Sequence, residues 1–180
     1  MYESLNNKVV LVTGGAGGIG RSIAERFAGQ GCKLVVNDIN AAAAAEVVDA
    51  ITAAGGQAIA AIADVSDSAQ VATMFETLVA EYGDIDVLVN NAGITRDAMI
   101  HRMTDEQWDS VLAVNLTGAF HLCRAAYPVM RGASTDSPAH HRKVVNITSI
   151  NGIYGTVANA NYSAAKAGLI GLTKTLARES

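Results

Sequence analysis

Short apolar runs alternate with longer amphipathic segments along the whole chain. Runs rich in Val, Ile, Leu and Ala, bounded by glycine or polar residues, predict buried strands at residues 9–13, 33–38, 57–63, 86–90 and 143–149. Helical periodicity predicts helices at residues 21–28, 41–54, 68–82, from 104 toward 130, and along the small-residue run 164–176. Strand and helix therefore follow one another at short spacing.

This alternation is typical of an α/β fold in which right-handed crossovers place helices on both faces of a parallel sheet. We expect one domain, residues 1–180, with a doubly wound parallel sheet of the Rossmann type. Ligands of such sheets bind at the carboxyl ends of the strands. The residues that end or directly follow the predicted strands are Gly14, Asp38, Asp64, Asn90 and Ser149.

The first strand leads into a glycine-rich turn, Gly14 to Gly20, and then into a helix. Glycine adopts positive φ without steric cost, and the missing side chain lets backbone amides approach a pyrophosphate at the helix N-terminus. A glycine cluster in this strand–turn–helix context predicts a dinucleotide-binding turn rather than a merely flexible one.

Asp38 ends the second strand, 18 residues beyond Gly20. An acidic residue about 20 residues after such a turn accepts hydrogen bonds from the adenine ribose. A 2′-phosphate on that ribose would meet the like charge of Asp38, and neither the glycine turn nor Ile39 and Asn40 supplies an arginine. The prediction is NAD, with NADP as the alternative cofactor. A structural alternative is that Asp38 caps the alanine-rich helix that follows.

Tyr162 and Lys166 are four positions apart at the start of the last helix, so their side chains share one face. A free phenol has a pKa of about 10, and a nearby cation favours the phenolate and lowers that value. Tyr-x-x-x-Lys is therefore a workable acid/base pair. Asn115 lies in the long helix despite its poor helix propensity. It is either tolerated there or marks a kink or a water site.

Composition and charge exclude several classes of function. The chain has 50% apolar residues and a net charge of −4, which argues against nucleic acid or an anionic membrane as the main partner.

Cys32 and Cys123 are expected to be reduced core residues. The polar N-terminus and the lack of an apolar run of about 20 residues predict a cytoplasmic protein. His140 and His141 lack partners at metal-ligand spacing, so no metal site is predicted.

Together these motifs resemble those of the short-chain dehydrogenase/reductase family over essentially the whole chain. The pattern T-G-x-x-x-G-I-G at residues 13–20 matches the cofactor fingerprint of that family, and N-N-A-G at residues 90–93 matches its fourth-strand motif. The step of 13 residues from Ser149 to Tyr162 is the family's usual one. The residues that match its catalytic tetrad are Asn115, Ser149, Tyr162 and Lys166.

The resemblance implies an NAD(P)-dependent oxidoreductase that interconverts a carbonyl and a secondary alcohol by hydride transfer. Tyr162 would exchange a proton with the substrate oxygen, while Lys166 would assist it and bind the nicotinamide ribose. Ser149 would hold the substrate oxygen, and Asn115 would anchor a water for proton exchange. The cofactor-binding residues implied are Gly14, Gly18, Ile19, Gly20, Asp38, Asp64, Val65, Asn91, Ala92, Gly93, Tyr162 and Lys166.

Within the family, residues 93–97 and 160–171 resemble the 3-oxoacyl-thioester (acyl-carrier-protein) reductases of fatty acid metabolism. Those enzymes mostly use NADPH and carry an arginine in or near the glycine turn, where this chain has Ala16 and Gly17. This likeness and Asp38 therefore point to different cofactors, and we give the cofactor chemistry more weight. Relatives pair through their long helices, which predicts a homo-dimer or homo-tetramer.

Relatives also run on for roughly 70 residues beyond the position of Ser180, so we expect a C-terminally truncated domain that lacks the substrate lid. Two other functions stay open at this point. One is a non-catalytic dinucleotide-binding module or inactive fragment. The other is a sugar-nucleotide epimerase, whose relatives share the Tyr–Lys pair but usually have the glycine spacing Gly-x-x-Gly-x-x-Gly.

Overall fold

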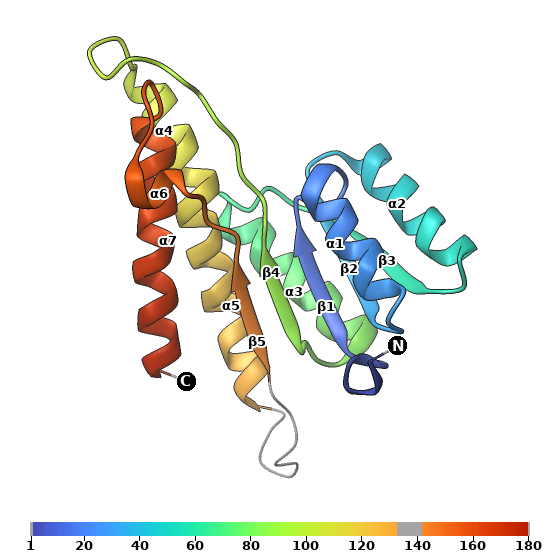
Figure 1. The fold of residues 1–180 in the computed structure, drawn as a ribbon. Helices are drawn as coiled ribbons and strands as arrows, with labels where there is room; N and C mark the ends of the chain where they lie inside the picture. The colour runs from blue at the N-terminus through green and yellow to red at the C-terminus, as the bar shows by residue number, and fades with distance from the viewer. Residues whose placement is uncertain (1, 133–141, 180) are drawn as a thin grey trace.

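A parallel sheet forms the centre of the molecule. A computed structural model describes residues 2–132 and 142–179, and within them the sheet has the strand order β3-β2-β1-β4-β5. All four strand pairs are parallel, which confirms the predicted doubly wound α/β fold (Figure 1). The strands are β1 (Val9–Thr13), β2 (Lys33–Asp38), β3 (Gln57–Ile62), β4 (Val87–Asn90) and β5 (Lys143–Asn146).

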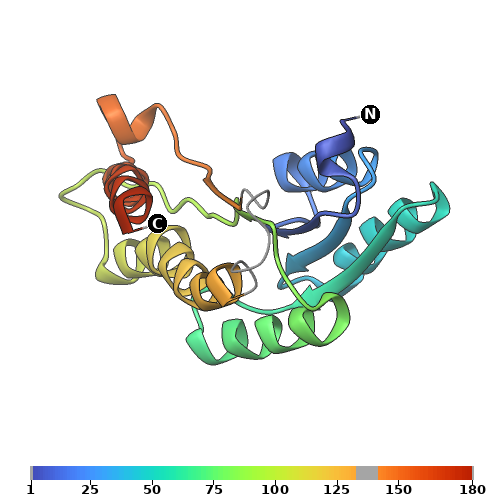
Figure 2. The same ribbon diagram turned by 90° about the horizontal axis from the view of Figure 1, so that it is seen from below.

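Helices cover both faces of this sheet, as the view from below shows (Figure 2). Helices α1 and α2 pack on one face, whereas α3 and α5 pack on the other. The helices are η1 (Glu3–Leu5), α1 (Gly18–Ala28), α2 (Ala41–Ala53), α3 (Ser68–Tyr82), α4 (Asp105–Leu112), the π-helical η2 (Ala113–Thr117), α5 (Gly118–Gly132), α6 (Asn151–Tyr154) and α7 (Ala160–Glu179).

The central strand β1 is buried on both sides. Val10 and Val12 belong to the core under α1 and α2, and Leu11 belongs to the core under α3 and α5. A strand covered on both faces needs apolar residues at every position, which explains its continuous apolar run. Cys32 and Cys123 are buried, unpaired thiols, one in each core.

The edge strand β5 is much less covered than β1. Lys143 and Val145 are exposed, and Val144 and Asn146 are only half-buried. A groove of about 540 Å³ runs beside it, between α5 and the C-terminal part of α7. Its lining includes Cys123, Tyr127, Val144 and Leu176. The sheet thus has a fully buried centre and, among the described residues, an open flank at β5.

Capping residues define several helix ends. Asp67 accepts hydrogen bonds from Ala69 N and Gln70 N at the start of α3, and Gly83, with φ +76°, ends that helix. Thr104 and Gln107 form the predicted capping box at the start of α4. Both caps satisfy backbone groups that have no partner within their own helix.

Several predicted boundaries were wrong. Helix α1 begins at Gly18, inside the glycine turn, and α2 ends at Ala53. Strands β3 and β4 are one residue shorter than expected, since Ala63 and Asp86 lie outside them. The predicted long helix is three consecutive segments, α4, η2 and α5, in which Gly118 N bonds to Ala113 O in the π pattern. Asn115 therefore marks a real departure from α-helical geometry.

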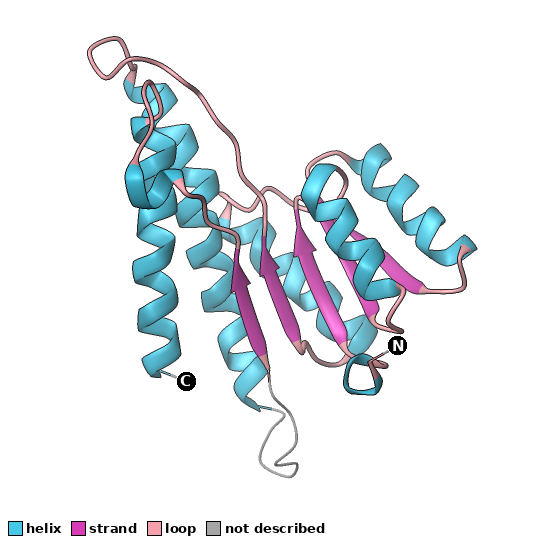
Figure 3. Ribbon diagram, viewed as in Figure 1, coloured by secondary structure: helices cyan, strands magenta, loops and turns pink. Residues whose placement is uncertain are grey.

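The region between β5 and α7 also differs from the prediction. Strand β5 ends at Asn146 rather than Ser149, because the Thr148 hydroxyl donates to Lys166 O and the chain turns toward α7. The predicted loop 150–161 contains the short helix α6, and α7 already begins at Ala160. The connections after β4 and β5 are long and lie together above the carboxyl ends of the strands (Figure 3).

Candidate functional site

The glycine turn packs α1 directly against the end of β1. Gly14 and Gly18 have φ of +59° and +50°, a region that L side chains rarely adopt. A Cβ at Gly20 would lie 2.0 Å from Gly14 O, so a side chain there has no room. These glycines are required by the turn itself.

The start of α1 faces open space. A Cβ added at Gly17 or Gly18 would meet no described atom within 4 Å, and the N-cap residue Gly17 has no side chain that could cap the helix. Ile19 is also exposed. The first amides of a helix carry partial positive charge and lack intrahelical acceptors. The turn therefore fits a phosphate group of a dinucleotide.

Asp38 lies beside this turn, at the end of β2. Its carboxylate accepts hydrogen bonds from Ala16 N at 3.2 Å and from Asn40 N at 3.1 Å. The alternative that Asp38 caps α2 is wrong, because Asn40 is the N-cap and accepts from Ala43 N. Asp38 is half-buried and joins the glycine turn to the end of β2.

Two further strand ends complete this side of the sheet. The Asp64 carboxylate accepts from Ser66 N at 2.8 Å and from Ser66 Oγ at 2.7 Å. Val65 is buried, and its carbonyl oxygen lies 3.2 Å from His121 Nδ1 on α5. His121 thus packs α5 against the connection that follows β3.

The N-N-A-G segment after β4 is tied to the glycine turn by Thr13, which the sequence analysis did not single out as a functional residue. The Thr13 hydroxyl accepts from Asn91 N and Ala92 N, both at 3.1 Å. Asn91 Nδ2 donates to Thr13 O and Gly14 O. Gly93, the last residue of the motif, lies against Asn115, since a Cβ there would be 3.3 Å from Asn115 Oδ1. The motif therefore fixes how β4 leaves the sheet.

Tyr162 and Lys166 lie on one face of α7, as their spacing predicted. Lys166 Nζ is 5.5 Å from the centroid of the Tyr162 ring and donates to Ile147 O at 2.7 Å. Lys166 is only 3% exposed, and burial lowers its pKa below the usual 10.5. A buried ammonium beside a phenol can stabilise developing negative charge on the phenol oxygen.

Ser149 is held next to this helix by the turn that begins α6. Its hydroxyl oxygen accepts from Asn151 N at 3.2 Å. Gly152 packs so closely on α7 that a Cβ would lie 2.7 Å from the Lys166 carbonyl carbon. The segment that carries Ser149 therefore rests on the turn of α7 that carries Lys166.

Asn115 is 1% exposed and binds the backbone of a single residue, Ile94. Its Oδ1 accepts from Ile94 N at 2.8 Å, and its Nδ2 donates to Ile94 O at 3.0 Å. The side chain thus holds the segment that follows Gly93. Anchoring of a water by this residue stays a prediction.

Two asparagines before Tyr162 belong to the same region but were not recognised from the sequence. Asn161 binds Arg96 O and Gln107 O, and Asn159 binds Asp97. The sequence signal was the presence of Asn at both 159 and 161, since this residue has poor helix propensity and favours caps and turns. Their partners are more than 50 residues away in the chain, so the signal does not identify them.

The described residues contain neither a cluster of metal-ligating side chains nor a helix able to cross a membrane. Within residues 2–132 and 142–179, no group of three His, Cys, Asp or Glu side chains is arranged to hold a metal ion. His140 and His141 lie outside these ranges. None of the described helices combines the length and apolar character needed to cross a membrane.

Comparison with known proteins identifies a consistent set of relatives. Residues 8–180 match the family model described as short chain dehydrogenase. The chain is 44% identical to the 3-oxoacyl-[acyl-carrier-protein] reductase of Synechocystis and 40% identical to that of Escherichia coli, over 98% of its length. It is 42% identical to part of the peroxisomal hydratase-dehydrogenase-epimerase of Saccharomyces cerevisiae.

Comparison with solved structures finds a relative from the same family. A short chain dehydrogenase from Mycobacterium avium superposes with a TM-score of 0.89 at 45% identity, covering 94% of this chain. The chain spans 69% of the Synechocystis protein, 68% of the Escherichia coli protein, 62% of the Mycobacterium avium chain and 20% of the yeast protein.

Proposed function

Because the chain belongs to the short-chain dehydrogenase family, we propose that it is the cofactor-binding and catalytic part of an oxidoreductase that interconverts a carbonyl and a secondary alcohol using NAD(P). The single observation that carries the proposal is the placement of two features at the carboxyl edge of one sheet. An uncapped helix start follows β1, and a buried lysine lies 5.5 Å from the Tyr162 ring after β5. A simple dinucleotide binder has no need of the second feature.

The residues present fit a nicotinamide dinucleotide. The amides of the glycine turn would hold its pyrophosphate, Asp38 its adenine ribose, and Lys166 its nicotinamide ribose. When bound, this cofactor supplies the hydride acceptor or donor. Gly93 and the residues after β4 would form the floor of the pocket between these groups.

The chain's own residues would then handle the proton and the substrate oxygen. Tyr162 donates a proton to the carbonyl oxygen during reduction and removes it from the alcohol in the reverse direction. Ser149 hydrogen-bonds the same oxygen and holds it within reach of the tyrosine. The buried ammonium of Lys166 favours the state in which the phenol oxygen carries negative charge.

The geometry of Asp38 supports NAD as the preferred cofactor. Its carboxylate is directed by two backbone amides, Ala16 N and Asn40 N, so its charge stays close to the predicted ribose position. A 2′-phosphate would meet that charge, and residues 14–20 contain no arginine to balance it.

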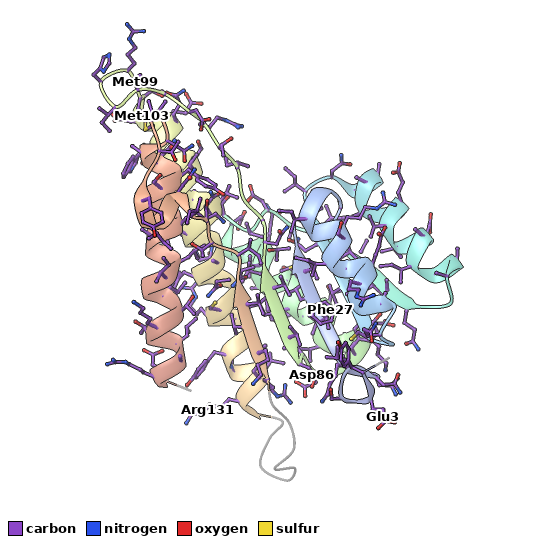
Figure 4. The ribbon with its side chains drawn as sticks, in the orientation of Figure 1. Glu3, Phe27, Asp86, Met99, Met103 and Arg131 are labelled. Carbon is purple, nitrogen blue, oxygen red and sulfur yellow. The ribbon has the colours of Figure 1, made fainter. Side chains whose placement is uncertain are left out.

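For the substrate we propose a 3-oxoacyl thioester. The relatives from Synechocystis and Escherichia coli carry this reaction in their names. Exposed apolar residues also surround the connections above the strands. These residues are Met99, Ile100, Ile150, Ile153, Tyr154 and Val157, and Figure 4 shows Met99 and Met103 on the loop that leads into α4. An acyl chain is the part of such a substrate that apolar side chains can contact.

The assay follows nicotinamide absorbance after NADH or NADPH is mixed with a short 3-oxoacyl thioester. Loss of absorbance with NADH, and a slower loss with NADPH, is the expected result. Cofactor binding is measured in parallel by NADH fluorescence. Binding without turnover would instead support the second candidate, a non-catalytic dinucleotide-binding module. No binding of either cofactor would contradict both proposals.

We also propose that copies of the chain associate through α5 and α7. Phe120 on α5 is 44% exposed, with the Arg124 guanidinium 4.9 Å from its ring centroid. An exposed aromatic residue paired with arginine is typical of the residues that anchor protein interfaces. Light scattering should give the mass of a dimer or tetramer, and the variant Phe120→Asp should shift it toward the monomer.

A further inference from the structure

Asn161, the residue directly before Tyr162, joins three parts of the molecule. It is fully buried. Its Nδ2 donates to Arg96 O and to Gln107 O, each at 2.9 Å. Its Oδ1 accepts from Tyr162 N at 2.8 Å. Both N–H groups and the oxygen of this amide are therefore in use.

The contact with Arg96 lies in a short segment that we call the strap, residues 94–98, which follows the N-N-A-G motif. The C-terminal end of the strap, Asp97 and Ala98, is also bound to the residues just before α7. Asn159 Nδ2 donates to the Asp97 carboxylate at 2.7 Å, and Ala98 N donates to Ala158 O at 2.9 Å. Ala98 and Asn159 form an isolated parallel bridge. The strap thus runs beside the start of α7.

Ala158 shows that this arrangement is imposed by tertiary contacts. Its φ of +61° lies in the left-handed region, which is sterically unfavourable for a residue with a Cβ. Such a conformation persists only when the surrounding structure determines it. The bonds from the strap to Ala158 O and Asn159 supply that determination.

The position of Tyr162 makes these bonds relevant to catalysis. Tyr162 lies in the first turn of α7, where backbone amides lack intrahelical acceptors and helices fray. Lys166 is one turn further on and is held by Ile147 O, in the residue directly after β5. The tyrosine end of the pair is held instead through Asn161 to the strap and to α4. The strap in turn is fixed by Asn115 through Ile94.

We propose that Asn161 is a positioning residue for Tyr162, acting by clamping the start of α7 to the strap and to α4. This inference rests on the proposed oxidoreductase function. The clamp consists of the two bonds donated by Asn161 Nδ2 and not of the bond accepted from Tyr162 N. It sets the Tyr162 hydroxyl relative to the groups that follow β4, where the nicotinamide would bind.

Two substitutions separate these bonds. Asn161→Ser keeps an oxygen that can accept from Tyr162 N but cannot reach both distant carbonyls, whereas Asn161→Ala removes all three bonds. A clamp predicts that both variants lose kcat by roughly 10- to 100-fold, because small displacements of a reacting group have effects of this size. KM for the thioester and Kd for NADH should stay within about twofold of wild type, because no substrate contact is lost.

Asn146→Ala is the matched control. Asn146 also binds α7, donating to Thr173 Oγ1 at 2.8 Å and accepting from Asn90 at 2.7 Å, but far from the start of the helix. It should lower the melting temperature while kcat changes little. If Asn161→Ala fails to fold, Asn161→Ser carries the test.

A second readout does not depend on turnover. Amide hydrogen exchange at residues 160–163 should become faster in both Asn161 variants and not in Asn146→Ala. Unchanged exchange, or a serine variant with wild-type kcat, would overturn the clamp while leaving the oxidoreductase function standing. An inactive wild-type chain would contradict the proposed function, and the exchange measurement would still decide whether Asn161 holds the start of α7.

Discussion

The two halves of the molecule are built in different ways. The glycine-turn half consists of β1, β2, β3, α1, α2 and α3, and the tyrosine half of β4, β5, α4, η2, α5, α6 and α7. In the first half the critical geometry comes from backbone conformation and missing side chains, as at Gly14 and Gly20. In the second half it comes from side-chain bonds between distant segments, such as Asn115 with Ile94 and Asn161 with Arg96.

The central strand β1 and the edge strand β5 also differ in burial. All five residues of β1 are buried, whereas every residue of β5 is exposed or half-buried. A segment with few buried apolar contacts opens more easily than a fully covered one. Substitutions in the glycine-turn half should therefore change stability and cofactor binding. Substitutions in the tyrosine half should change turnover first.

The largest expected effect is that of Tyr162→Phe in the tyrosine half. Removal of the hydroxyl takes away the proposed proton donor, and kcat should fall by roughly 100- to 10,000-fold. NADH binding, measured by fluorescence, should be nearly unchanged because the ring remains. Near-normal turnover in this variant would remove Tyr162 from the catalytic role.

The next effect is that of Gly20→Ala in the glycine-turn half. The new Cβ would overlap Gly14 O, at 2.0 Å, and overpacking of this kind costs about 1–3 kcal/mol. Denaturant unfolding should show the loss, together with weaker NADH binding. Gly17→Ala is the stability control, because a Cβ there meets no described atom within 4 Å. Equal stability of the two variants would contradict the packing argument.

Asp38→Ala tests the cofactor assignment in the same half. Loss of the ribose acceptor should raise the Michaelis constant for NAD by roughly 10-fold, equivalent to about 1.4 kcal/mol, and should relax the bias against NADP. Asp38→Asn keeps an acceptor oxygen without the charge. It should therefore admit NADP with a smaller loss of NAD binding. An unchanged preference in both variants would refute the assignment of NAD.

The smallest effect concerns the buried Lys166. Burial lowers its pKa in the folded state below the 10.5 of the unfolded chain. Between these two values the unfolded chain binds more protons, so the free energy of unfolding rises with pH there and is flat below the lower value. The free energy of unfolding of the wild type minus that of Lys166→Met should therefore increase as the pH rises toward 10.5. A difference independent of pH would show that burial does not shift this amine.

Much of the glycine-turn half could be predicted from the sequence. The strand 9–13, the turn at residues 14–20 and the acidic end of the next strand are contiguous signals, and each reflects a local physical requirement. Helix α3 was predicted with its observed bounds, because Asp67 and Gly83 mark its ends. The resemblance to the family, which the comparisons confirm, rested on this turn together with the N-N-A-G motif and the residues that match the catalytic tetrad.

The tyrosine half could be predicted only in part. The pairing of Tyr162 with Lys166 follows from helical spacing, and the capping box at Thr104 follows from local chemistry. The short β5, the helix α6 and the π-helical η2 did not follow from periodicity. The end of β5, for example, depends on a contact with a distant segment, the bond from the Thr148 hydroxyl to Lys166 O.

The sequence by itself determined the parallel α/β architecture, the glycine turn and the order of the residues that face the carboxyl edge, because strand and helix periods and glycine conformations act over a few neighbouring residues. Only the tertiary structure decided which polar groups hold the start of α7, and how Ser149 and Lys166 are fixed beside it. Those contacts join segments up to 65 residues apart. The hydrogen-bond partner of an asparagine such as Asn161 depends on which distant segment the fold brings next to it. The residues around the asparagine in the sequence do not specify that segment.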